Sequence, residues 1–71
     1  MSHRKEAIIV YKKFELLLVK NNKTAYQVSK ATGISTATLT NWKYGRYKPK
    51  VDKLKALAKY FGVTIDYFLE E

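Results

Sequence analysis

The sequence contains no cysteine, a single histidine and a single proline. Without cysteine the chain can form neither a disulfide nor a thiolate metal site. The one histidine, His3, lies near the N-terminus and has no second histidine with which to bind a metal ion. A chain without disulfides also fits a reducing compartment, and we expect a cytoplasmic protein.

The residue groupings that enzymes use are also missing. No paired carboxylates fall on a predicted structured face, no glycine-rich phosphate loop is present, and the serines and threonines lack a neighbouring general base. We therefore expect no enzymatic activity and no cofactor.

Long hydrophobic runs are absent. A membrane-spanning helix needs about 18 or more apolar residues in a row. The most apolar stretch, residues 8–19, is interrupted by Lys12, Lys13 and Glu15. It is therefore predicted to be neither a membrane span nor the core of a signal peptide.

Acidic residues are absent between Glu15 and Asp52, although the chain carries a net charge of +8. The cations in this interval are Lys20, Lys23, Lys30, Lys43, Arg46, Lys48 and Lys50. A polyanion would therefore meet one positive region and be repelled by the carboxylates at the C-terminus. The alternative is an ordinary solvated surface rich in lysine.

The same interval contains the pattern of two short helices joined by a tight turn, at residues 24–45. Thr24 and Gln27 have the spacing of a capping box, in which each side chain bonds the backbone amide of the other residue. Gly33 can adopt the left-handed conformation that ends a helix, and Ser35 is a good N-cap for a second helix. This outline is that of a helix-turn-helix.

Apolar residues in this segment are predicted to face the core. They are Val28, Ala31, Ile34, Leu39 and Trp42. A tryptophan in this position could also be a stacking platform, but its spacing from Leu39 favours burial.

Apolar periodicity predicts three further helices, at residues 6–20, 51–61 and 65–69, with Thr64 as N-cap of the last. Because 71 residues suffice for one domain, we expect a single domain over residues 1–71, with 1–5 as a disordered tail. The predicted fold is all-α, a compact five-helix bundle with a helix-turn-helix.

The first helix is more apolar than one small core requires. Ile8, Ile9, Leu16 and Val19 leave apolar area on a second side. Two explanations remain open, a surface for a partner protein and uneven packing in a small bundle.

Together these features resemble the helix-turn-helix of the lambda-repressor-like proteins, the Cro and Xre type. In that family a glycine, a basic loop and a proline follow the second helix of the motif. A leucine-rich helix then leads to Gly-Val-Ser/Thr and a hydrophobic–Asp–aromatic pattern. The matching residues are Gly33, Ile34, Leu39, Trp42, Gly45, Arg46, Lys48, Pro49, Leu54, Leu57, Ala58 and Phe61, followed by residues 62–69. The resemblance covers residues 10–69.

The sequence departs from the family pattern in two respects. Leu18 and Lys43 occupy positions where many members have an arginine–glutamate pair, and an apolar replacement of such a pair can be neutral. Lys43 is then free to face DNA. Lys23 stands where the family usually has an apolar residue, so this edge of the core is looser or Val19 covers it.

The resemblance implies that residues 35–43 form a recognition helix in the major groove of DNA. If Leu39 and Trp42 point inward, an opposite face is left for base contacts. The predicted base-contacting residues are Thr36, Ala37, Thr40 and Asn41. The Asn41 amide can pair with N6 and N7 of adenine, and the methyl groups of the others can contact thymine. The alternative is an exposed, threonine-rich helix face without function.

Cations and hydroxyl groups around this helix are predicted to contact phosphates. They are Thr24, Ser35, Lys43, Arg46, Tyr47 and Lys48. For Tyr44 two roles remain open, a hydrogen bond to phosphate and packing against the fourth helix.

We therefore predict a sequence-specific, double-stranded DNA-binding transcription regulator, a bacterial or phage repressor. The resemblance implies a homodimer on an inverted repeat, formed before or only upon DNA binding. It also implies that the dimer forms through the C-terminal region, here Tyr67, Phe68 and Leu69. The alternative is an antitoxin-like or other protein-interaction module that mainly binds a partner protein; membrane binding is not expected.

Overall fold

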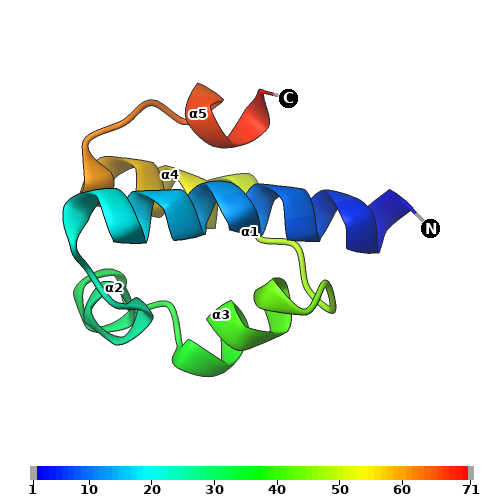
Figure 1. The fold of residues 1–71 in the computed structure, drawn as a ribbon, viewed down its shortest axis with the longest axis horizontal. Helices are drawn as coiled ribbons and strands as arrows, with labels where there is room; N and C mark the ends of the chain where they lie inside the picture. The colour runs from blue at the N-terminus through cyan, green and yellow to red at the C-terminus, as the bar shows by residue number, and fades with distance from the viewer. Residues whose placement is uncertain (1, 71) are drawn as a thin grey trace.

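Five α-helices follow one another along residues 2–70, the part of the chain that the computed structural model describes (Figure 1). They are α1 (Ser2–Asn21), α2 (Ala25–Thr32), α3 (Thr36–Lys43), α4 (Val51–Phe61) and α5 (Asp66–Leu69). The all-α fold predicted from the sequence is confirmed.

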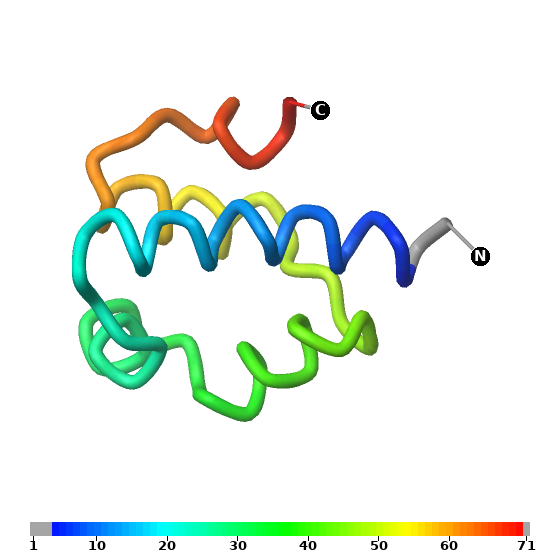
Figure 2. The backbone as a smooth tube through the Cα atoms, viewed as in Figure 1, coloured from blue at the N-terminus to red at the C-terminus, as the bar shows by residue number. Residues whose placement is uncertain are grey.

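α1 runs through the middle of the molecule and separates the helix-turn-helix from α5. It contacts α3 on one side and α5 on the other, while α4 contacts α2 and α5 (Figure 1). The backbone trace shows the same order, with the α2–α3 pair and the loop after α3 below α1 (Figure 2). The helix-turn-helix is therefore supported from one side by α1 and α4.

The predicted helix caps are present at both helices of the motif. The Gln27 backbone N–H donates to Thr24 Oγ1 at 3.1 Å, and the Thr24 N–H donates to Gln27 Oε1 at 2.9 Å. Gly33 has a φ of 81°, the left-handed conformation that favours glycine at a helix end. Ser35 Oγ accepts from the Thr38 N–H at 3.1 Å. The turn geometry is thus fixed by hydrogen bonds within a few residues.

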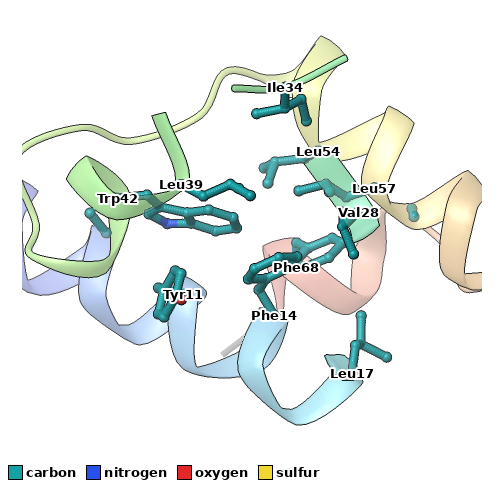
Figure 3. Packing of buried hydrophobic residues seen from close by; sticks show 12 residues of the cluster. Tyr11, Phe14, Leu17, Val28, Ile34, Leu39, Trp42, Leu54, Leu57 and Phe68 are labelled. Atoms are coloured by element: carbon teal, nitrogen blue, oxygen red, sulfur yellow. The ribbon is translucent and has the colours of Figure 1, made fainter. Parts of the chain in front are cut away.

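Trp42 is fully buried and lies beside Leu39 and Tyr11 in the core (Figure 3). Its ring centroid lies 5.3 Å from that of Tyr11 and 5.2 Å from that of Phe14, both on α1. Burial, with smaller contributions from Glu15 and Tyr44, raises the pKa of the Tyr11 phenol above its usual value of 10.0, so this ring stays neutral near pH 7. The buried hydrophobic residues are Ala7, Tyr11, Phe14, Leu17, Val28, Ile34, Leu39, Trp42, Leu54, Leu57, Ala58 and Phe68.

α1 begins at Ser2, four residues before the predicted start, so residues 2–5 are helical where a disordered tail was expected. Met1 lies outside the described residues. The first turn of α1 packs against the loop after α3. A Cβ atom built on Gly45 would come within 2.5 Å of Arg4 Cγ and 3.1 Å of the Arg4 carbonyl oxygen. This contact, between residues 41 positions apart, was not visible in the local sequence pattern.

Three predictions of local packing were wrong. Ala31 is exposed, because α2 turns Ala25, Val28 and Thr32 toward the rest of the molecule instead. Val51, which the apolar periodicity of residues 51–61 places on the buried side of that helix, is 52% exposed because it begins α4 at the loop end. Thr64 is not the N-cap of α5; that residue is Ile65, which already has helical φ and ψ angles of −59° and −30°.

Candidate nucleic-acid interface

The outer face of α3 consists of the four residues predicted to contact bases. Leu39 and Trp42 are 2% and 0% exposed and fix the inner face of the helix. Thr36, Ala37, Thr40 and Asn41 are all exposed. An α-helix with its side chains is about 10–12 Å across, so α3 can enter a major groove about 12 Å wide. The structure brings these four side chains together on one small face that lacks carboxylates.

The N-terminal turn of α3 leaves backbone N–H groups without helical partners, as every helix does. One of these groups, the Thr38 N–H, donates to Ser35 Oγ. The Ser35 hydroxyl in turn donates to Thr38 Oγ1 at 2.9 Å. No acidic residue occurs in the turn. The positive end of the helix dipole is therefore open to an anionic group such as a phosphate.

The loop that follows α3 folds back on the helix. Gly45 adopts a φ of 76°, and its N–H donates to the Trp42 carbonyl oxygen at 3.0 Å. The Arg46 N–H donates to the Asn41 carbonyl oxygen at 2.8 Å. Pro49, farther along the loop, is buried. The backbone thus returns Arg46 to the last turn of α3.

Aromatic and cationic side chains gather where this loop leaves α3. The Arg46 Cζ atom lies 5.2 Å from the Tyr44 ring centroid, and Lys43 Nζ lies 5.7 Å from the same centroid. Such cation–π contacts at exposed sites contribute about 0.5–1 kcal/mol. Tyr44 is 51% exposed. About half of Tyr44 is therefore open to solvent, and the contacts found for its ring are with these two cations.

The predicted phosphate-contacting residues differ in how available they are. Lys43 and Arg46 are exposed, and Ser35 is exposed at the start of α3. Lys48 is also exposed, but its Nζ lies 3.2 Å from Glu6 Oε1 on α1. An exposed ion pair contributes only about 0–1 kcal/mol, so Lys48 can exchange this carboxylate for a phosphate at small cost.

The other two predicted phosphate contacts have structural roles as well. Tyr47 is half-buried and packs against the core, which leaves only part of its side chain at the surface. The Thr24 hydroxyl is occupied in the capping box with Gln27. The edge of the core beside Lys23 is not covered by Val19, which is 81% exposed.

α2 carries an exposed pair that sequence reasoning missed. Tyr26 is 63% exposed, and Lys30 Nζ lies 5.9 Å from its ring centroid. The indication in the sequence was the spacing of four residues, which places two side chains side by side on a helix. Since the first helix of a helix-turn-helix crosses the DNA backbone, this pair adds a cation to the candidate interface.

The predicted dimerisation residues do not share one surface. Phe68 is 1% exposed and belongs to the core, so its assignment to a dimer interface is corrected. Tyr67 is half-buried, and its hydroxyl donates to the Lys13 carbonyl oxygen at 3.1 Å. Leu69 is 54% exposed. A short helix of four residues must turn one aromatic side chain inward to hold its place, and here that side chain is Phe68.

Clusters of metal-binding side chains and membrane-spanning helices were both looked for in the described part of the chain. Residues 2–70 contain no group of three or more histidine, aspartate or glutamate side chains that could hold a metal ion. None of the five helices there is both long enough and apolar enough to cross a membrane.

Comparison with known proteins gives two matches to helix-turn-helix sequences. The helix-turn-helix family matches residues 15–68. The "HTH-type transcriptional activator BcrR" of Enterococcus faecalis is 32% identical over 57 residues, which are 80% of this chain and 28% of that protein. The chain therefore spans less than a third of the length of this relative. No solved structure gives a significant match.

Proposed function

The chain belongs to the Cro/C1-type helix-turn-helix family of DNA-binding transcription regulators, and from that premise we propose that it recognises a specific operator by inserting α3 into the major groove. The observation that carries the proposal is the outer face of α3. Thr36, Ala37, Thr40 and Asn41 are exposed together, and Lys43 and Arg46 lie beside them. Small and polar side chains can approach base edges, and the neighbouring cations attract the phosphates on either side.

The distribution of charge also favours DNA binding through the outer face of α3. No carboxylate occurs between Glu15 and Asp52, and this interval contains α2, α3 and the following loop. A protein of net charge +8 gains non-specific affinity for DNA by releasing counterions from the phosphates. Because the acid-free interval includes the helix-turn-helix, this attraction favours approach through α3. A DNA partner is consistent with the cytoplasmic location expected from the sequence.

The size of the domain supports a homodimer on an inverted repeat. Successive major grooves on one side of DNA lie about 34–36 Å apart, whereas the longest dimension of the domain is 31 Å. One chain, with its single recognition helix, therefore reads one half-site, and two chains are needed to read both half-sites. Repression by occupying the operator is the proposed mode of regulation, and a promoter–reporter assay distinguishes it from activation.

A randomised-oligonucleotide selection tests the function, with Asn41→Ala as the informative variant. We expect the wild-type protein to enrich an inverted repeat with half-site centres about 10–10.5 base pairs apart. Asn41→Ala should lose about 1–3 kcal/mol of discrimination at one base pair of each half-site. Thr64→Ala, an exposed change on the loop before α5, serves as the control and should leave the enriched sequence unchanged. Equal base preferences for Asn41→Ala and wild type would contradict the base-reading role.

A protein-interaction module is the second candidate, and it is favoured by the outer side of α1. Leu16 and Val19 are 63% and 81% exposed, and they line an open groove with Leu18. Lys12, Lys23 and Glu15 also line this groove, and Lys12 Nζ lies 3.9 Å from Glu15 Oε1. The partner that fits is a protein segment with apolar residues and a carboxylate that can meet Lys23, as an amphipathic helix would supply.

The two candidate functions are distinguished by measuring DNA binding and protein binding for the wild type and for one double variant. Leu16→Ser combined with Val19→Ser should leave DNA affinity unchanged if DNA is the main partner, because neither residue lies on α3. The interaction module replaces the main proposal under two conditions. Wild type must bind no duplex at low salt, and it must bind the co-expressed product of a neighbouring reading frame in a way that the double variant abolishes.

A further inference from the structure

Asn41 and Arg46 are joined by two contacts at the end of α3. The Arg46 backbone N–H donates to the Asn41 carbonyl oxygen at 2.8 Å, and Arg46 Nη1 donates to Asn41 Oδ1 at 3.4 Å. Both side chains are exposed. The side-chain contact is long for a hydrogen bond, but the backbone contact keeps the guanidinium within reach of the amide.

The Tyr44 ring limits the positions that the guanidinium can take. Arg46 Cζ lies 5.2 Å from the ring centroid, a distance at which a guanidinium is attracted to an aromatic face. Tyr44 follows Asn41 by three residues, so both side chains project from the same side of the last turn of the helix. Arg46 is therefore held between a ring and an amide, whereas Lys48 is tied only to the exposed carboxylate of Glu6.

An asparagine that reads adenine needs a defined orientation of its amide. Its Oδ1 must accept from N6 of the base while its Nδ2 donates to N7. The terminal torsion of asparagine is broad and roughly two-fold, so a free side chain also samples the reversed amide, which cannot make this pair. A donor bonded to Oδ1 removes that freedom. Because a carbonyl oxygen has two lone pairs, Oδ1 keeps one of them for the base.

We propose that Arg46 is a positioning residue that fixes the orientation of the Asn41 amide, and that Tyr44 holds Arg46 in place for this task. The inference rests on the proposed base-reading role of Asn41. It gives Arg46 a part in specificity in addition to its contact with phosphate, since one guanidinium has five N–H donors and can serve both partners.

The test compares two variants that each remove one positive charge from the same loop, Arg46→Ala and Lys48→Ala. Affinities are measured for the selected operator and for operators changed at each single base pair, at two salt concentrations. Lys48→Ala should weaken binding to all operators by the same factor and make the dependence of log affinity on log salt shallower. Arg46→Ala should in addition lose a large part of the roughly 5- to 150-fold discrimination at the base pair read by Asn41.

Three further variants make the result specific. Arg46→Lys keeps the charge but lacks the planar guanidinium, so the salt dependence should recover while the discrimination stays low. Tyr44→Leu should lower the discrimination at the same base pair. In the Asn41→Ala background, Arg46→Ala should change that discrimination no further, because the amide that it orients is gone.

The inference is overturned if Arg46→Ala weakens binding to all operators equally, as Lys48→Ala does, while Asn41→Ala still loses discrimination. In that case the function proposed for α3 stands and Arg46 contacts phosphate alone. If Asn41→Ala also leaves every base preference unchanged, the base-reading role and the inference both fail. Thermal unfolding of each variant checks that the fold is intact, which is expected because these side chains are exposed.

Discussion

Replacement of Trp42 by alanine is expected to lower the free energy of unfolding by about 3–5 kcal/mol, the usual cost of truncating a large buried aromatic residue. Trp42 is 0% exposed and packs against Tyr11 and Phe14. At about 0.05–0.15 kcal/mol per residue, a chain of this length has only about 4–11 kcal/mol of stability. The substitution therefore removes a large fraction of it, and the thermal midpoint should fall by at least about 12 °C.

Trp42→Phe is the matched control for this prediction. The indole Nε1 is buried and has no hydrogen-bond partner among the described residues, so phenylalanine removes ring volume but also removes a polar group that costs free energy when it is unpaired. We expect Trp42→Phe to be clearly less destabilising than Trp42→Ala when unfolding is followed by far-ultraviolet circular dichroism. If Trp42→Ala kept full stability and lost only DNA affinity, the residue would be a stacking platform and its place in the core would be wrong.

The helix-turn-helix was predictable from the sequence because its geometry is fixed locally. The capping box of Thr24 and Gln27 spans three residues, and the left-handed Gly33 needs only its own backbone. Ser35 caps the next helix from the adjacent position. Interactions of this range depend on residue types at fixed spacings, which a single sequence displays directly. The burial of Leu39 and Trp42 followed from the same helical spacing.

Packing between distant segments was less predictable. Lys48 reaches Glu6 across 42 positions of sequence, and no local pattern pairs these two residues. Phe68 and Leu69 are both apolar, and only the position of α5 against α1 decides that Phe68 is buried and Leu69 exposed. The prediction that Ala31 faces the core was wrong for a similar reason. Helical periodicity locates the apolar side of a helix, but a residue at the border of that side can be buried or exposed depending on how the helix is packed.

The contact between Arg46 and Asn41 was partly predictable from the sequence. The two residues are only five positions apart, but they meet because Gly45 takes a positive φ between them. A glycine just after a helix predicts a reversal of the chain, but not which side chain the next residue will meet. Glycine positions after a recognition helix are therefore useful places to look for side chains that return to it.

A carboxylate at position 37 should greatly weaken specific DNA binding without harming the fold. Ala37 is exposed in the first turn of α3, where a negative charge is favourable because of the helix dipole and adds about 0.3–1 kcal/mol to stability. In the proposed complex the same charge would face phosphates and base edges, and like-charge contact in an interface costs several kcal/mol. We expect Ala37→Glu to reduce operator affinity by about 100-fold or more while its unfolding temperature is unchanged or slightly raised.

Thr64→Glu separates this local effect from the change in net charge. Thr64 is exposed and belongs to the segment between α4 and α5. This segment lies on the side of α1 away from α3 (Figure 1), and the substitution changes the charge by the same amount. It should weaken operator binding only slightly, since one distant charge is screened within about 10 Å at ordinary salt. Equal losses for the two variants would mean that α3 does not enter the groove. A large loss for Ala37→Glu alone, at unchanged stability, requires close approach of the start of α3 to DNA, because a charge more than about 10 Å from the phosphates is largely screened.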